Sequence, residues 1–145
     1  MAKKTISKKV NPIGKERVLN FAFVHDKKTK LYPFSFKGVR LSNGVKKEIA
    51  QYIDILKQDK LPIKKVVLFG SYAKGVQNKW SDVDLCIVSP KFKNTFSALQ
   101  YLSSKVIFDM KYTIEPHPYH PKNFINEDPL VWEIKKTGKI IYENL

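Results

Sequence analysis

The sequence has little of several features that would define a protein class on their own. A single cysteine, Cys86, leaves no partner for an internal disulfide, which favours a reducing, cytoplasmic location. No uncharged apolar run approaches the roughly 20 residues of a membrane-spanning helix, so we expect no membrane partner. The basic start, Met1 to Lys9, leads into no apolar stretch, so we expect no secretory signal. With only 6 Gly and 8 Pro in 145 residues, collagen-like and low-complexity classes are excluded.

Acidic residues are also scarce, and their scarcity is uneven along the chain. There are 27 Lys and Arg against 13 Asp and Glu, a formal net charge of +14. Residues 1–65 hold 17 basic and 5 acidic residues, whereas residues 66–145 hold 10 and 8. A strongly basic half predicts a polyanionic partner such as RNA, and a lysine-rich surface that only keeps the protein soluble is an equal alternative.

The order of apolar patterns predicts one α+β domain over residues 41–145. We expect helices at 43–58, 94–107 and 129–138, and short strands at 65–69, 83–88, 111–115 and 140–142. The Pro-rich segment 116–128 is expected to be irregular. Alternating elements of this kind predict a small mixed β-sheet with flanking helices, mainly on one face. In the second helix, the side chains expected to face the core are Phe96, Leu99, Leu102 and Val106.

Residues 1–40 form a basic N-terminal extension, with 11 basic and 2 acidic residues. Alternating apolar positions in Val18–Val24 and Leu31–Phe36 predict a β-hairpin. Its aromatic side chains can stack on the bases of an RNA strand or pack against the domain. The second interpretation is slightly favoured, because so many apolar residues in one short segment usually need burial.

The chemistry is concentrated between two buried strands. The first strand ends at Gly70-Ser71, where a sharp turn and a hydroxyl donor favour phosphate oxygens, and Lys74 adds a positive charge nearby. Asp82 and Asp84 are two residues apart at the start of the next strand, so their carboxylates are expected on one face. Two carboxylates this close repel each other, and a bound Mg²⁺ together with substrate phosphates would remove that repulsion.

A third carboxylate would complete a two-metal site. Glu115 is the candidate, because alternation along the third strand puts it on the face of the two aspartates. Asp109 is the second choice, since it precedes that strand. His117 and His120 are interpreted as loop residues near the site, because zinc ligation would need further ligands at matching spacing. Cys86 is interpreted as a small core residue.

These residues together resemble the nucleotidyltransferase superfamily of DNA polymerase beta, in its stand-alone minimal form. The signature of that family is a strand, Gly-Ser, a helix start and a later Asp-x-Asp on the adjacent strand, here Gly70-Ser71 and Asp82-Val83-Asp84. The run Ile114–Tyr119 resembles a recurring segment of minimal members in which Glu holds the third-acid position. The resemblance covers about residues 43–142 and leaves residues 1–40 outside.

The resemblance implies transfer of a nucleoside monophosphate, AMP from ATP being expected, to a hydroxyl on a protein or RNA. It implies that Gly70, Ser71 and Lys74 bind the triphosphate. It further implies that Asp82, Asp84 and Glu115 bind two Mg²⁺ ions, with Glu115 also helping to accept the proton of the acceptor.

The resemblance also bears on the partner. Many minimal members are paired with a HEPN-type protein and act as its antitoxin by adenylylating it, which implies a HEPN-like partner here. The basic half favours a nucleic-acid acceptor instead. An alternative of another class is a non-catalytic nucleic-acid-binding module that retains the fold. Three clustered acids argue against that alternative, because a binding module has no need for them.

Overall fold

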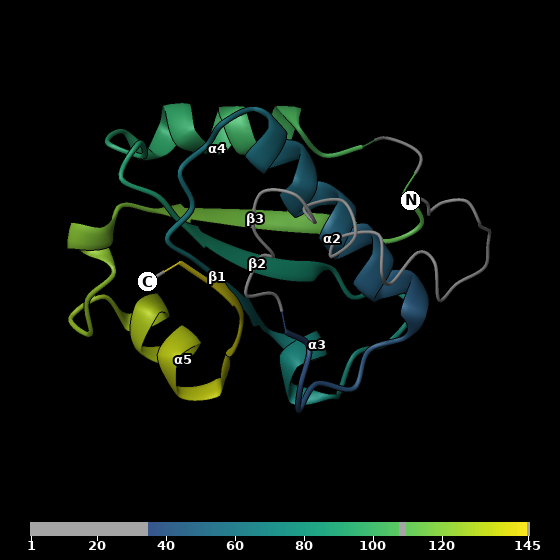
Figure 1. The fold of residues 1–145 in the computed structure, drawn as a ribbon. Coiled ribbons are helices and arrows are strands. Elements are labelled where there is room, and N and C mark those ends of the chain that lie inside the picture. Colours follow the sequence, from purple (N-terminus) through teal and green to yellow (C-terminus); the bar gives the residue numbers. More distant parts are fainter. Residues whose placement is uncertain (1–34, 108–109, 145) are drawn as a thin grey trace, which may run out of the picture.

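A four-stranded mixed sheet forms the centre of the computed structural model, which describes residues 35–107 and 110–144 (Figure 1). The strands are β1 (Lys65–Phe69), β2 (Val83–Val88), β3 (Ile114–Tyr119) and β4 (Lys139–Glu143), in the spatial order β3-β2-β1-β4. β1 is antiparallel to β2 and to β4, whereas β2 and β3 are parallel.

The helices that flank this sheet are α2 (Asn43–Gln58), α3 (Ser71–Lys74), α4 (Thr95–Ser104) and α5 (Pro129–Thr137), with a short 3-10 helix η2 (Pro121–Asn123). The expected α+β architecture is therefore confirmed. Asp109 and nearly all of the expected N-terminal hairpin lie outside the described residues. No helix in the described ranges is long and apolar enough to cross a membrane.

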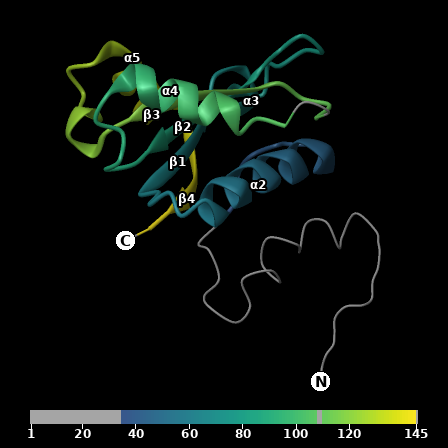
Figure 2. The ribbon, with the colours of Figure 1, turned by 90° about the horizontal axis from the view of Figure 1, so that it is seen from above.

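Alternation along β1 divides the core into two layers. Val66 and Leu68 are buried in the larger layer, beneath α2 and α4. Val67 and Phe69 face the other way, into a smaller layer closed by Ile134 of α5. Seen from above, α2 and α5 lie on opposite sides of the strands (Figure 2). The expectation of helices mainly on one face holds for α2 and α4, while α5 covers the second face.

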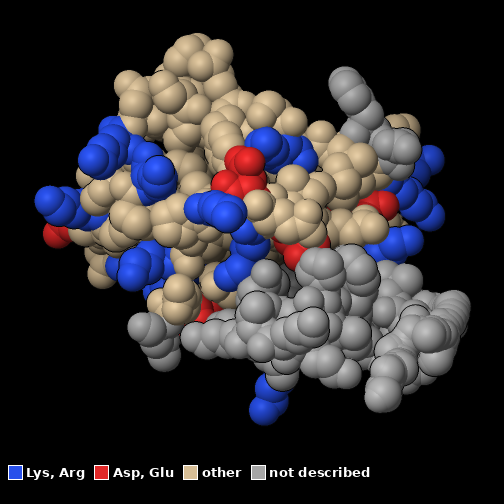
Figure 3. Space-filling model, turned by 45° about the horizontal axis from the view of Figure 1, so that its top comes forward, with Lys and Arg blue, Asp and Glu red and all other residues tan. Residues whose placement is uncertain are grey.

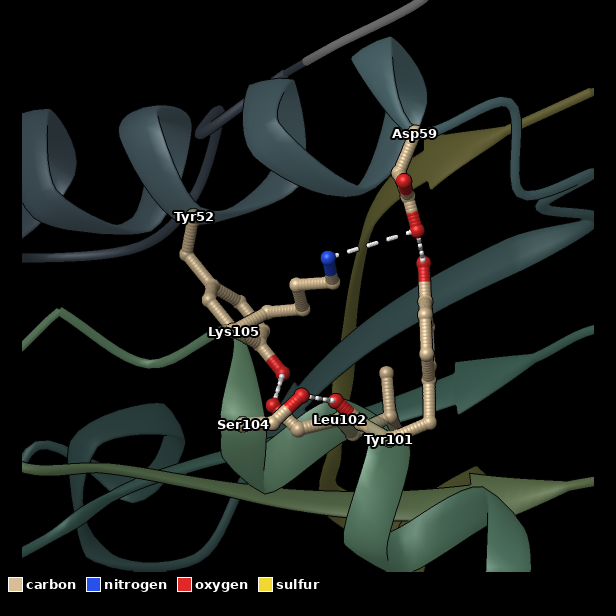
Figure 4. A network of polar contacts seen from close by, with 6 residues as sticks. All are labelled: Tyr52, Asp59, Tyr101, Leu102, Ser104 and Lys105. Carbon is tan, nitrogen blue, oxygen red and sulfur yellow. Dashed lines mark hydrogen bonds and ion pairs between the residues drawn. The ribbon is translucent and has the colours of Figure 1, made fainter.

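Helix α2 has the bounds and the buried face that the sequence predicts. Ser42 caps its start by accepting a hydrogen bond from the backbone N–H of Val45. The buried residues recur at helical spacing and include Tyr52, which is fully buried. The Tyr52 hydroxyl donates to the carbonyl oxygen of Leu102 at 2.8 Å and so joins α2 to α4 (Figure 4). Burial raises the pKa of Tyr52 far above its usual value, which keeps the hydroxyl neutral.

Helix α4 departs from the expectation in its length and in its buried face. It ends at Ser104, and only Ala98 and Leu102 on it are buried. Phe96 and Leu99 were expected to face the core, but 70% and 41% of their surfaces are exposed. The expectation was wrong because α4 packs on the sheet through a narrow stripe, so that the wider apolar pattern of its sequence faces outward.

The third strand begins later than expected and extends through prolines. Glu48 of α2 accepts hydrogen bonds from the backbone N–H groups of Lys111 and Tyr112, both at 2.8 Å, which diverts these residues from the sheet. The strand then runs from Ile114 to Tyr119, through residues expected to be irregular. Parallel pairing with β2 holds this Pro-rich segment extended, a tertiary effect that local composition does not reveal.

The prolines in β3 occupy positions where they cost no hydrogen bond to β2. Thr113 and Tyr119 accept hydrogen bonds from β2, so the odd-numbered residues of this segment direct their backbone groups inward. Pro116 and Pro118, at even positions, therefore direct their backbone groups outward, toward the open edge of the sheet. Because proline lacks an N–H, this edge offers few donors to a further strand.

The contact between α2 and α4 allows a direct stability test. Tyr52→Phe removes a buried hydrogen bond and should lower the free energy of unfolding by about 1 kcal/mol in urea denaturation. Tyr101→Phe is the matched control on the same two helices, because the Tyr101 hydroxyl donates to Asp59 at the surface (2.6 Å), where water can replace it. An equal or larger loss for Tyr101→Phe would contradict the assignment of Tyr52 as the buried link.

Candidate active site

The site begins at the turn between β1 and α3. Gly70 follows the last residue of β1 with φ 74°, and its carbonyl accepts hydrogen bonds from the N–H groups of Ala73 and Lys74. A Cβ at this position would overlap Asp84 Oδ2, so backbone conformation and close approach both require glycine. Ser71, half-buried, begins α3 directly beside this contact.

Strand register brings two of the predicted acids to the same place. Phe69 pairs with Asp84 across β1 and β2, and Asp84 pairs with Glu115 across β2 and β3. One ligand atom each of Asp84, Glu115 and His117 lies within 4.8 Å of the other two. The end of β1, the start of β2 and the edge strand β3 thus converge on one cluster of Asp84, Glu115 and His117, which we call the carboxylate cluster.

His117 is the member of the carboxylate cluster that sequence reasoning placed in a loop. Its Nε2 lies 3.2 Å from Asp84 Oδ1, and its ring meets that of Phe69 edge-on with centroids 4.8 Å apart. His117 is two residues after Glu115 on β3, so both side chains share one face of the sheet. That alternation was the available signal, and it was hidden because the prolines on either side suggested an irregular segment.

The remaining predicted residues surround the carboxylate cluster without joining it. Asp82 is exposed just before β2 and does not belong to the cluster. Burial raises the pKa of the nearby Tyr72 hydroxyl, and the charge of Asp82 adds to this effect. Lys74 Nζ lies 3.0 Å from Glu133 Oε2 of α5. The hydrogen bond and charge of Lys74 lower the pKa of Glu133, so this ion pair must open if Lys74 is to bind a phosphate.

Two residues that could suggest other chemistry have structural roles. His120 Nδ1 accepts a hydrogen bond from the N–H of Lys122 and so caps η2. Cys86 is fully buried between strands, and burial raises the pKa of its thiol to about 12, which makes it inert. The interpretation of Cys86 as a core residue agrees with this environment.

A groove of about 960 Å³ opens beside the carboxylate cluster. Asp82, Glu115 and His117 line one part of it, and it continues along β3 between α4 and the segment from η2 to α5. We call it the β3 groove. It gives the cluster an open approach from solvent, on the side of the sheet edge.

The donor atoms of the carboxylate cluster fit a divalent cation. Two carboxylates suit Mg²⁺, which binds through one or two carboxylates and substrate phosphates. An imidazole beside them would also suit Mn²⁺ and other transition metals. Nucleotide phosphates could reach such an ion from the Gly70-Ser71 turn, since a side chain at Gly70 would overlap Asp84. The arrangement can therefore hold a metal-bound nucleotide next to an acceptor in the groove.

Comparison with known sequences assigns this domain to a family. The model of the nucleotidyltransferase domain family matches residues 49–142, which include β1 to β3 and the carboxylate cluster. The chain belongs to this family. The chain is thus a nucleotidyltransferase, as its Gly-Ser and Asp-x-Asp residues predict.

Three individual proteins are similar to this chain to different degrees. A Methanocaldococcus jannaschii protein named "Putative protein adenylyltransferase MJ1379" is 34% identical over 93 residues, 58% of this chain and 90% of that protein. A chain from a crystal structure of a mutant toxin–antitoxin, MntA-HpeT, shares the fold with TM-score 0.50 and 18% identity, over 72% of this chain and 75% of that chain. A chain from the complex of tri-AMPylated Shewanella oneidensis HEPN toxin with MNT antitoxin aligns with TM-score 0.42 and 16% identity, over 67% and 71%.

Substitution of two glycines that share a positive φ tests the geometry at Asp84. Gly70 and Gly75 have φ 74° and 75°, but a Cβ at Gly75 would meet no atom within 4 Å. Both alanine variants should lose stability from backbone strain, Gly75→Ala by roughly 1 kcal/mol in its left-handed conformation (ψ 23°) and Gly70→Ala by more at ψ −156°. Only Gly70→Ala should also displace Asp84 and weaken Mn²⁺ binding, measured by calorimetry. Equal Mn²⁺ affinity in the two variants would contradict the role assigned to the contact between Gly70 and Asp84.

The place of His117 in the carboxylate cluster leads to a prediction about metal preference. His117→Ala should weaken Mn²⁺ binding by about tenfold and Mg²⁺ binding by less, because Mg²⁺ prefers oxygen ligands. Calorimetric titrations with each ion, in the presence of a non-hydrolysable ATP analogue, measure both affinities. His120→Ala is the control, since His120 caps η2 and lies outside the carboxylate cluster. The same loss for both ions would leave His117 as a residue that orients Asp84.

Proposed function

We propose that this protein transfers AMP from ATP to a hydroxyl group of a protein acceptor, in a reaction that depends on a divalent metal. The observation that carries the proposal is the register of three strands that brings Asp84, Glu115 and the Gly70 turn together in a nucleotidyltransferase domain. The 34% identity with a relative named as a protein adenylyltransferase supports both AMP and the protein acceptor.

Different residues of the chain bind the nucleotide and accept the proton. Gly70 and Ser71 bind the β- and γ-phosphates, and Lys74 contributes once it leaves Glu133. Asp84 and Glu115 would hold Mg²⁺, and Asp82, which lies outside the carboxylate cluster, would have to turn toward them to complete a two-metal site that neutralises charge on the phosphates and on the acceptor oxygen. The acceptor oxygen forms a bond to the α-phosphorus and pyrophosphate leaves. Glu115, at the mouth of the β3 groove, takes the proton of the acceptor hydroxyl.

The acceptor we propose is a HEPN-like protein, with the chain acting as its antitoxin. Support comes from the fold shared with a chain of a toxin–antitoxin structure and from the segment Ile114–Tyr119, which resembles that of minimal family members. RNA is the second candidate acceptor, favoured by the 11 basic residues within residues 1–40. A binding module without activity would also use those residues, but it gives no reason for Asp84 and Glu115 to converge.

Nucleotide binding and transfer separate the roles of the two clustered acids. ATP should bind in calorimetry with Mg²⁺ and fail to bind in EDTA, because bare carboxylates repel phosphates. Asp84→Asn should abolish binding and transfer. Glu115→Gln should keep most of the binding and lose at least about a hundredfold in transfer of label from [α-³²P]ATP, since the acceptor proton then has no base. ATP binding that is equal in EDTA would refute metal dependence.

A further inference from the structure

The walls of the β3 groove combine three exposed aliphatic side chains. Leu99 comes from α4, Ile125 from the segment after η2, and Leu130 from the first turn of α5. Their exposed fractions are 41%, 45% and 38%. Leu99 was expected to face the core, and its outward position is explained if this wall is a contact surface. Apolar side chains gathered beside a reactive centre are typical of a binding surface.

The groove differs from the rest of the described surface in its charge. Among the described residues, its lining includes the acids Asp82, Glu115, Glu127 and Asp128 and no Lys or Arg. The whole chain has twice as many basic as acidic residues. On the face drawn in Figure 3, Lys and Arg side chains lie in several separate groups and outnumber the acidic ones. The absence of Lys and Arg from the lining of a 960 Å³ groove is therefore a local property that sets this surface apart among the described residues.

We infer that the β3 groove is the docking surface for the acceptor, and that it takes an uncharged or basic polypeptide segment. The inference rests on the proposed function and adds to it the place and the charge of acceptor recognition. A polypeptide fits because Leu99, Ile125 and Leu130 offer apolar contacts and Glu127 attracts a basic side chain. An RNA strand does not fit, because binding of its phosphates requires Lys or Arg to replace the released counterions.

The edge of β3 restricts how such a segment is held. Pro116 and Pro118 line the groove and direct their backbones outward without an N–H. The acceptor therefore cannot add to the sheet as a regular further strand. The acceptor must therefore be recognised by side-chain contacts in the groove, and the acceptor hydroxyl must reach Glu115 in the carboxylate cluster.

Two isoleucine variants test the groove by making the same substitution inside it and outside it. Ile125→Lys puts a positive charge in the groove, whereas Ile140→Lys puts one on β4, outside it, at a position that is similarly exposed (51%). The probes are three peptides with a central Tyr flanked by Lys, Ala or Glu, and a single-stranded RNA 20-mer. Transfer from [α-³²P]ATP and fluorescence anisotropy of the labelled probes measure modification and binding separately.

The wild type should bind and label the Lys-flanked peptide best and the Glu-flanked peptide least. Ile125→Lys should reduce labelling and binding of the Lys-flanked peptide by about tenfold, and Ile140→Lys should leave both unchanged. Both variants should retain MgATP affinity, which shows that they are folded.

Three outcomes would overturn the inference. The first is that the two variants have equal effects, and the second is that labelling of RNA rises in Ile125→Lys. The third is that the wild type binds MgATP but neither binds nor labels any peptide. A different result would separate the two proposals. If the wild type transfers no label but binds the peptide, and only Ile125→Lys loses that binding, the proposed function is refuted and the docking surface remains.

Discussion

The contact between Gly70 and Asp84 is the constraint on which the site depends. The Asp84 carboxylate occupies the space that a side chain at Gly70 would fill. The position of the turn after β1 relative to the acid on β2 is therefore fixed. The pairing of Phe69 with Asp84 fixes this approach along the strands. A shift of one residue would turn Asp84 to the opposite face, into the apolar layer under α2. The chemistry of the site is thus linked to the same register that buries the core.

The two faces of the sheet serve different purposes. Beneath α2 and α4 the layer is large and apolar, and Tyr52 spans it with a hydrogen bond to the backbone of α4. Under α5 the apolar layer is small and includes Val67, Phe69 and Cys86. His117 packs on Phe69 at the border of that smaller layer. The polar cluster can therefore lie beside a buried surface without breaking the main core.

Much of the fold was predictable because its signals are local. The bounds of α2 and the Gly-Ser turn follow from short-range patterns that the structure reproduces. The errors arose where tertiary contacts decide. Glu48 holds the backbone before β3 from 63 residues away, and Leu99 turns outward because α4 contacts the sheet through a narrow stripe.

The same division explains what was predicted of the site. The motif residues Gly70 and Asp84 lie together as expected, because strand alternation and a turn are enough to place them. His117 belongs to the carboxylate cluster because β3 pairs in parallel with β2. A Pro-rich sequence does not predict such a strand. Asp82 shares a motif with Asp84, but it lies before the strand begins, where alternation no longer fixes its side chain.

The two edges of the sheet differ in how their backbone groups are used. At β3, Pro116 and Pro118 take away outward donors, and at β4 the N–H of Ser35 donates to the carbonyl of Ile141 at 2.8 Å. Short strands rich in Val and Ile are the segments that most readily stack between molecules when an edge is free. The prolines beside Glu115 therefore protect the protein from self-association at the strand that must stay open to solvent. Replacing them would restore outward N–H donors and expose that strand to aggregation.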